Sequence, residues 1–150
     1  MTSIKLIKLK QEHFKLLFKW INLKSVIKNS LKKKKIKYNE HKKWFSKQIK
    51  SKNIIKIIYY KKMAIGVIRL EKKNYNYFIS YLIIPSHRKK GFAYQALKHI
   101  LFNKKIKNIK KLVAIVKKDN IPSIKIFSKL KFRQIGKLKD KKLVKFEYII

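Results

Sequence analysis

Apolar residues recur along this chain with two different spacings, which predict a mixture of strands and helices. Residues 4–9, IKLIKL, alternate apolar side chains with lysine, as expected of a half-buried strand. Residues 11–21 place Phe14, Leu17 and Phe18 three or four positions apart, which predicts a helix packed on one side. Similar patterns predict further strands at 53–60, 63–71, 75–85, 111–116, 132–138 and 141–150. Further helices are predicted at 38–49, 91–102 and 119–130. Their candidate starting residues are Asn39, Gly91 and Asn120, respectively.

The predicted order of elements is β-α-α-β-β-β-α-β-α-β-β. Short polar turns at 61–62 and 72–74 join the three strands of the first half, which therefore pair antiparallel. We find no internal repeat, flexible linker or break in composition, so we expect one domain over residues 1–150. The fold class is an α/β (α+β) mixture.

The formal net charge of +37 allows two interpretations. A strongly basic surface is typical of proteins that bind nucleic acids. However, only three of the 43 basic residues are arginine, and arginine is the residue that reads phosphates and bases with a two-pronged guanidinium. The lysines are also spread along the whole chain, apart from one dense run at 31–37. We therefore favour a coding bias with an anion-friendly surface over a dedicated nucleic-acid site.

The remaining composition excludes several kinds of site. The chain has no cysteine, which excludes disulfides and thiolate metal ligands, and we expect no metal. No apolar run approaches the roughly 20 residues that cross a bilayer, and the start is too polar for a signal peptide. We expect a cytoplasmic protein with no membrane partner.

Residues 87–97, HRKKGFAYQAL, place a glycine between a basic cluster and the start of a helix. The unpaired amides of a first helical turn, together with the helix dipole, favour a bound anion. Gly91 allows the main chain to approach that anion because it has no Cβ, and Ala93 keeps the approach open. The spacing predicts a phosphate-binding turn, although an ordinary helix start with solvated lysines has the same pattern.

Residues 79–97 resemble the acetyl-CoA-binding motif of the GNAT N-acetyltransferases, in which a strand and a proline precede Arg/Gln-x-x-Gly-x-Gly/Ala and a helix. Residues 120–132, NIPSIKIFSKLKF, resemble the second signature of that family, and the order of elements matches it over nearly the whole chain. This resemblance implies the GNAT fold: a mixed, mostly antiparallel sheet of six to seven strands, flanked by about four helices and splayed between strands 4 and 5. It also implies acetyl-CoA as the co-substrate.

The resemblance assigns roles residue by residue. Gly91 admits the pyrophosphate of coenzyme A to the amides of residues 88–93, with formal charge from the three preceding cations. Main-chain groups near Leu82 and Ile83 hold the pantetheine arm, and an N–H there polarises the thioester carbonyl. Asn120 contacts the cofactor from the second motif, and it is also a plain N-cap candidate. The full set of expected cofactor-binding residues is Leu82, Ile83, Arg88, Lys89, Lys90, Gly91, Phe92, Ala93, Asn120 and Phe127.

Two residues depart from the family pattern. Phe127 occupies the place of a tyrosine that protonates the departing thiolate, which phenylalanine cannot do. Solvent or another hydroxyl, such as Tyr94 or Ser123, has to replace it, or activity is weak. Lys131 occupies the place of a glycine, which costs about 1 kcal/mol if its conformation is left-handed.

The N-terminal half resembles one branch of this family through FKWIN at 18–22 and YNEHKKWF at 38–45. That branch acetylates nucleotide-linked amino sugars in pathways to pseudaminic and related nonulosonic acids. The resemblance places Trp20, Asn22 and His41 at the acceptor pocket, with His41 as a polar wall or proton acceptor. Glu71 and Tyr81 are the other candidate catalytic bases.

Two alternatives to a small amine acceptor remain open. One is N-acetylation of a ribosomal protein, although enzymes of the ribosomal alanine type have a glutamate where this chain has Ile115. The other is a catalytically weak domain that binds nucleic acid through its charge. We expect a monomer or a homodimer.

Overall fold

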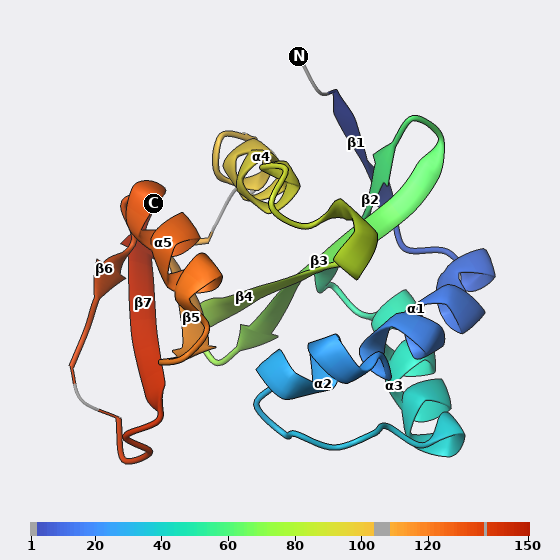
Figure 1. Ribbon diagram of the computed structural model, residues 1–150, viewed down its shortest axis with the longest axis horizontal. Coiled ribbons are helices and arrows are strands. Elements are labelled where there is room, and N and C mark those ends of the chain that lie inside the picture. The colour runs from blue at the N-terminus through green and yellow to red at the C-terminus, as the bar shows by residue number, and fades with distance from the viewer. Residues whose placement is uncertain (1–2, 104–108, 137) are drawn as a thin grey trace.

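The computed structural model describes residues 3–103, 109–136 and 138–150, which form one seven-stranded sheet with helices on both faces (Figure 1). The strands are β1 (Ile4–Lys8), β2 (Ile54–Tyr60), β3 (Met63–Lys73), β4 (Asn76–Ile83), β5 (Lys111–Lys117), β6 (Arg133–Gln134) and β7 (Leu143–Ile149). The helices are α1 (Phe14–Ile21), α2 (Lys24–Asn29), α3 (Tyr38–Lys50), α4 (Phe92–Leu101) and α5 (Ile121–Lys129). Short 3₁₀ turns at Gln11–His13 and Pro85–His87 precede α1 and α4.

The strand order is β1-β2-β3-β4-β5-β7-β6, and every neighbouring pair is antiparallel except β4 and β5. This arrangement confirms the mixed, mostly antiparallel sheet that the sequence predicts. It also places the carboxyl ends of β4 and β5 at the same edge of the sheet, because these two strands run parallel.

The two faces of the sheet carry separate apolar clusters. On one face, α1 and α3 pack on β2 and β3 around Trp20, Phe45 and Ile57. On the other face, α4 and α5 pack on the central strands around Leu97, Phe127 and other buried residues. Side chains alternate between faces along a strand, so Leu82 packs with the first cluster and its neighbour Ile83 with the second.

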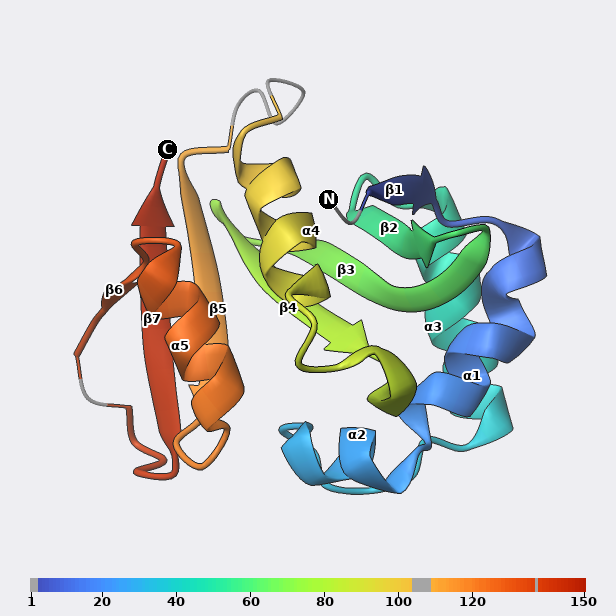
Figure 2. The same cartoon turned by 45° about the horizontal axis from the view of Figure 1, so that its top comes forward.

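The sheet is splayed where β4 meets β5. These strands pair only at Tyr77 with Leu112 and at Phe78 with Val113, whereas β4 stays paired with β3 as far as Ile83. Figure 2 shows β4 and β5 starting side by side and separating toward the end of the molecule where α2 lies. The predicted splay is therefore confirmed, and it leaves one edge of β4 without a partner strand.

Local boundaries differ from the sequence prediction in three places. Helix α2 is not predicted, because none of its residues is buried and it has no apolar stripe. Asn39 is not a cap, since α3 begins at Tyr38 and Lys37 precedes it with an extended backbone. The strand predicted at 132–138 is reduced to the two residues of β6, and residue 137 lies outside the described residues.

Candidate active site

The turn between β4 and α4 has the shape of an anion-binding loop. Lys89 and Gly91 both adopt left-handed backbone conformations, with φ of 60° and 81°, and Gly91 caps α4. A Cβ on Gly91 would have only the side-chain nitrogen of Gln95 near it, at 4.0 Å, so the space in front of the turn is open. The first amides of α4 have no acceptor within the helix and are available to a ligand.

The structure corrects one expected contact in this turn, that of the Arg88 amide, and limits the contacts of Phe92 and Ala93 to their main chains. The amide of Arg88 donates to the carbonyl of Pro85 at 3.3 Å, so it is not among the free amides. The side chains of Phe92 and Ala93 are buried in the core, so only their main chains can meet a ligand. Lys89 and Lys90 are exposed and provide the formal charge next to Gly91.

Arg88 extends into the splay between β4 and β5. Its Nε donates to the carbonyl oxygen of Ile83 at 2.9 Å. Burial lowers the pKa of Arg88, while the nearby hydroxyl of Tyr81 raises it. Arg88 therefore lies at the end of β4, and it does not extend into solvent beside Lys89 and Lys90 as a simple phosphate ligand would.

The open edge of β4 is formed by alternate residues. The amide of Ile84 donates to the carbonyl of Ile65 at 2.9 Å, which makes Ile83 and its partner Gly66 a pair that exchange no hydrogen bonds directly. The main-chain groups of Ile83, and by alternation those of Tyr81, consequently face the splay.

The main-chain groups of Leu82 point the opposite way, toward β3. A Cβ built on Gly66 would overlap the carbonyl oxygen of Leu82, which shows how closely that carbonyl approaches β3. The expectation that main-chain groups of Leu82 face the cofactor is therefore corrected to Tyr81, and Ile83 keeps its expected orientation.

Tyr81 crosses the splay and joins β4 to α5. Its hydroxyl lies 2.5 Å from Oγ of Ser123, and burial raises the pKa of Tyr81. A phenol with a raised pKa is protonated at neutral pH, so Tyr81 is unsuited to the role of general base that the sequence suggested.

Phe127 belongs to the core. Its side chain is 2% exposed, and its ring lies 5.0 Å from that of Phe132 and 6.1 Å from that of Tyr81, centroid to centroid. Its ring packs near that of Tyr81, and it has no hydroxyl that could protonate the thiolate. This is the consequence expected from phenylalanine in place of the family's tyrosine.

Helix α5 begins beside the splay. Asn120 caps it by accepting a hydrogen bond from the amide of Ser123 at 3.4 Å, as predicted. A cavity of about 300 Å³ lies between this helix start, Arg88 and α2. It is lined by Ser25, Lys28, Asn29, Arg88, Asp119, Asn120 and Pro122. A larger open hollow of about 540 Å³ lies along α3 and shares none of these residues.

The residues expected at the acceptor pocket lie in the layer formed by α1 and α3. Trp20 is buried in the apolar cluster there. The amide nitrogen of Asn22 donates to the carbonyls of Phe18 and Ile36, both at 3.1 Å, and its oxygen accepts from the amide of Ile36 at 2.8 Å. Asn22 therefore fastens the loop before α3 to the end of α1, and its amide is already engaged.

His41 is also engaged. It is 1% exposed and surrounded by aromatic rings, and its Nε2 donates to the carbonyl of Phe14 at 3.1 Å. Burial lowers the pKa of His41, so the imidazole is neutral and its Nε2 already carries a hydrogen. Neither nitrogen lines the cavity beside Arg88, and the geometry does not favour the role of proton acceptor.

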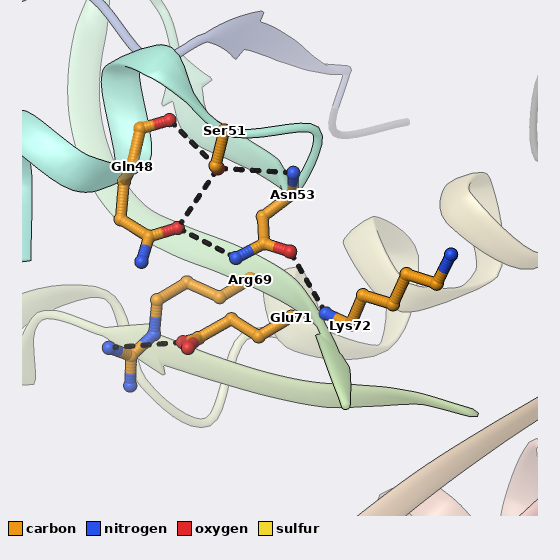
Figure 3. Close-up of polar contacts among 6 residues, drawn as sticks. All are labelled: Gln48, Ser51, Asn53, Arg69, Glu71 and Lys72. Atoms are coloured by element: carbon orange, nitrogen blue, oxygen red, sulfur yellow. Dashed lines mark hydrogen bonds and ion pairs between the residues drawn. The ribbon is translucent and has the colours of Figure 1, made fainter. Parts of the chain in front are cut away.

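Glu71 keeps a partly exposed carboxylate on β3. Its Oε1 lies 3.9 Å from Nη1 of Arg69, next to hydrogen bonds that join Gln48, Ser51, Asn53 and Lys72 (Figure 3). Arg69 lies over the ring of Trp44 at 5.6 Å, which fixes the guanidinium beside Glu71. Of the three candidate bases, Glu71 is the one whose proton-accepting atoms are partly open to solvent.

The described residues contain no group of three or more histidine or acidic side chains that could hold a metal ion. Within the same part of the chain, no helix is long and apolar enough to span a bilayer.

The arrangement of β4, the Gly91 turn and α4 beside the splay is that of the GNAT class of acyltransferases. The family comparison leads to the same class. The family model described as acetyltransferase (GNAT) domain matches residues 3–133, so the chain belongs to this family. No protein of curated function matches the sequence.

Several solved structures share the fold over nearly the whole chain. A domain from Methanocaldococcus jannaschii is 23% identical, with full coverage of both chains and a TM-score of 0.87. Spermidine N-acetyltransferase from Vibrio cholerae, solved with CoA and spermine, is 18% identical over 97% of this chain and 95% of its own, with a TM-score of 0.87. RimL, a ribosomal L7/L12 protein acetyltransferase solved with coenzyme A, is 16% identical over 100% and 96%, with a TM-score of 0.84. At these identities the likeness establishes the fold.

Proposed function

We propose that the protein transfers the acetyl group of acetyl-CoA to a primary amine by direct attack within a ternary complex. The observation that carries this proposal is the unpartnered edge of β4, which leads from the open Gly91 turn to Tyr81 along the splay. Such an edge fits an extended amide-bearing chain in the way that a sheet edge accepts an added strand, because the main-chain groups of Tyr81 and the N–H of Ile83 face the splay. The carbonyl of Ile83 already accepts a hydrogen bond from Nε of Arg88. Acetyl-CoA supplies the activated thioester.

The residues of the cleft then have separate tasks. The amides from Gly91 onward and the positive end of α4 hold the diphosphate, with Lys89 and Lys90 adding charge. An N–H on the open edge of β4 stabilises negative charge on the thioester oxygen as the amine attacks. The amine nitrogen bonds to the acetyl carbon, the carbon–sulfur bond breaks, the amine loses a proton and the thiolate gains one. Glu71 is our candidate for the first proton, and the protonated Tyr81–Ser123 pair is our candidate source of the second.

We propose an acceptor that carries anionic groups, specifically a nucleotide-linked amino sugar. The net charge of +37 attracts phosphates and repels polycations such as spermidine. Arg88 and Lys28 place two of these cations beside the cavity at the splay. A cytoplasmic location and a monomeric or homodimeric state are part of this proposal.

The test is transfer of labelled acetyl from acetyl-CoA to a panel of acceptors at low and physiological salt. The panel contains a nucleotide-linked amino sugar, the free amino sugar, spermidine and a ribosomal-protein N-terminal peptide, with Glu71→Gln and Gly91→Trp as variants. We expect the nucleotide-linked sugar to react fastest, with a preference that declines as salt rises. Faster transfer to spermidine or to the peptide overturns the acceptor assignment. Failure of the wild type to bind acetyl-CoA at millimolar levels, together with salt-sensitive binding of nucleic acid, overturns the enzymatic proposal itself.

A further inference from the structure

Helix α2 closes the wide end of the splay. Figure 2 shows α2 beyond the end of β4, and Nζ of Lys117, the last residue of β5, donates to the carbonyl of Lys28 at 2.5 Å. The two residues are 89 positions apart in the sequence. Lys117 is 6% exposed and is the one buried lysine among the described residues.

The contact between Lys117 and Lys28, which we call the α2 latch, suits both partners. The last carbonyls of a helix receive no hydrogen bond from an N–H of the same helix, and they carry the negative end of the helix dipole. A lysine ammonium beside them is therefore favourable. Lys117 satisfies one such carbonyl at the end of α2 and thereby fixes a six-residue helix that buries none of its own residues. Since no residue of α2 is fully buried, the α2 latch is a specific contact that joins this helix to the end of β5.

Ser25 is a polar residue of α2 that lines the cavity. Its Oγ is buried and has no hydrogen-bond partner, the one such side-chain atom among the described residues. Ser25 lines the cavity together with Arg88 and Asn120. Buried polar atoms in native proteins nearly always have a partner, so this unpaired hydroxyl, on a residue that lines the cavity, is open to a hydrogen bond with a ligand.

We infer that Ser25 is a cofactor-binding residue that hydrogen-bonds the pantetheine arm of acetyl-CoA, and that Lys117 is the positioning residue that holds it there through α2. This inference rests on the proposed function. Arg88 links this cavity to the proposed path of the arm, because it lines the cavity and its Nε binds the carbonyl of Ile83 at the end of β4. Ser25, Asn29 and Asn120 are neutral polar residues on the lining of this cavity. Neutral donors and acceptors suit the amides of the arm.

The first test separates the arm from the nucleotide. Calorimetric titration measures the affinity of wild type and Ser25→Ala for coenzyme A, and for the adenine nucleotide that remains when the pantetheine arm is removed. Loss of one neutral hydrogen bond should weaken coenzyme A binding by about 3- to 10-fold and leave nucleotide binding within about twofold. Equal affinities of both proteins for coenzyme A overturn the inference. A wild type that binds neither ligand overturns the proposed function instead.

The second test addresses the α2 latch. Lys117→Met removes the Nζ donor and retains most of the side-chain stem, Lys118→Met is the exposed neighbouring control, and Lys117→Arg restores a donor. We expect Lys117→Met to weaken coenzyme A binding as much as Ser25→Ala does, with no change in nucleotide binding, and Lys117→Arg to recover part of the loss. Lys118→Met should bind both ligands like the wild type.

The double variant distinguishes positioning from a separate effect. If Lys117 acts by placing Ser25, adding Ser25→Ala to Lys117→Met causes no further loss of coenzyme A affinity. Multiplied losses overturn the positioning role of Lys117. A rise in the acceptor KM with unchanged coenzyme A affinity in Ser25→Ala assigns α2 to the acceptor and also overturns the inference.

Discussion

Substitution of Gly91 by alanine tests the proposed diphosphate site, because the chain contains a matched control glycine. Gly91 and Gly136 both have positive φ, 81° and 57°, and neither has a neighbour that a methyl group would strike. The cost of either substitution to folding is therefore the left-handed backbone alone. That cost is about 1 kcal/mol of unfolding free energy for each variant.

Ligand binding should separate the two variants. In Gly91→Ala the new methyl enters the open space in front of the first α4 amides, where the proposed diphosphate lies. We expect acetyl-CoA affinity to fall at least about 10-fold, equivalent to roughly 1.4 kcal/mol. Gly136 lies in the loop after β6, an edge strand that β7 and β5 separate from the splay, so Gly136→Ala should bind acetyl-CoA like the wild type.

Urea denaturation gives the unfolding free energies, and calorimetric titration gives the affinities. Gly91→Asn adds a second arm, since asparagine tolerates left-handed backbone better than alanine does. It should regain stability without regaining affinity. Unchanged acetyl-CoA affinity in Gly91→Ala, with the expected loss of stability, would refute the assignment of the diphosphate to this turn.

Three further predictions concern the packing of the core and the protonation of its buried histidines. Gly66→Ala should lower the unfolding free energy by about 1–3 kcal/mol, because its Cβ overlaps the carbonyl of the neighbouring strand, and an unchanged melting temperature would contradict this. Burial lowers the pKa values of His13 and His41 below 6.5, so the unfolded chain binds more protons below that pH and stability should fall by up to about 1.4 kcal/mol per pH unit for each. Urea titrations between about pH 7.5 and 5.5 should show that the stability of His41→Gln depends less steeply on pH than that of the wild type; equal slopes would rule out this origin. Phe127→Tyr should leave acetyl-CoA affinity within about twofold while burial of its hydroxyl costs about 1–3 kcal/mol of stability, and a large loss of affinity in titration would place its side chain in the cleft.

The N-terminal half of the chain, where we expected the acceptor pocket, shows that a residue pattern can indicate a fold without indicating which side chains bind the substrate. Trp20, Asn22 and His41 match a family pattern, yet in the structure their side chains are buried or engaged within the layer of α1 and α3. A tryptophan or histidine has the same spacing on a helix whether it faces a pocket or a neighbouring helix. The direction depends on how α1 and α3 pack against each other, which no local pattern records.

Helix α2 was missed for a related reason. Prediction from periodicity requires an apolar stripe, and none of the six residues of α2 is fully buried. The contact that holds this helix joins Lys28 to Lys117, and nothing in the sequence distinguishes Lys117 from the other lysines except its place at the end of an apolar strand.

The sequence by itself determined the features that depend on short-range backbone rules. The alternation of side chains predicts the strands, the caps at Gly91 and Asn120 begin two helices, and the glycine turn follows from the need for positive φ. The tertiary structure alone decided which edge of β4 is open, that Tyr81 and Ile83 face it, that Arg88 turns back onto it, and that α2 closes it. These features depend on the pairing and divergence of strands far apart in the sequence, which the local spacing of residues does not encode.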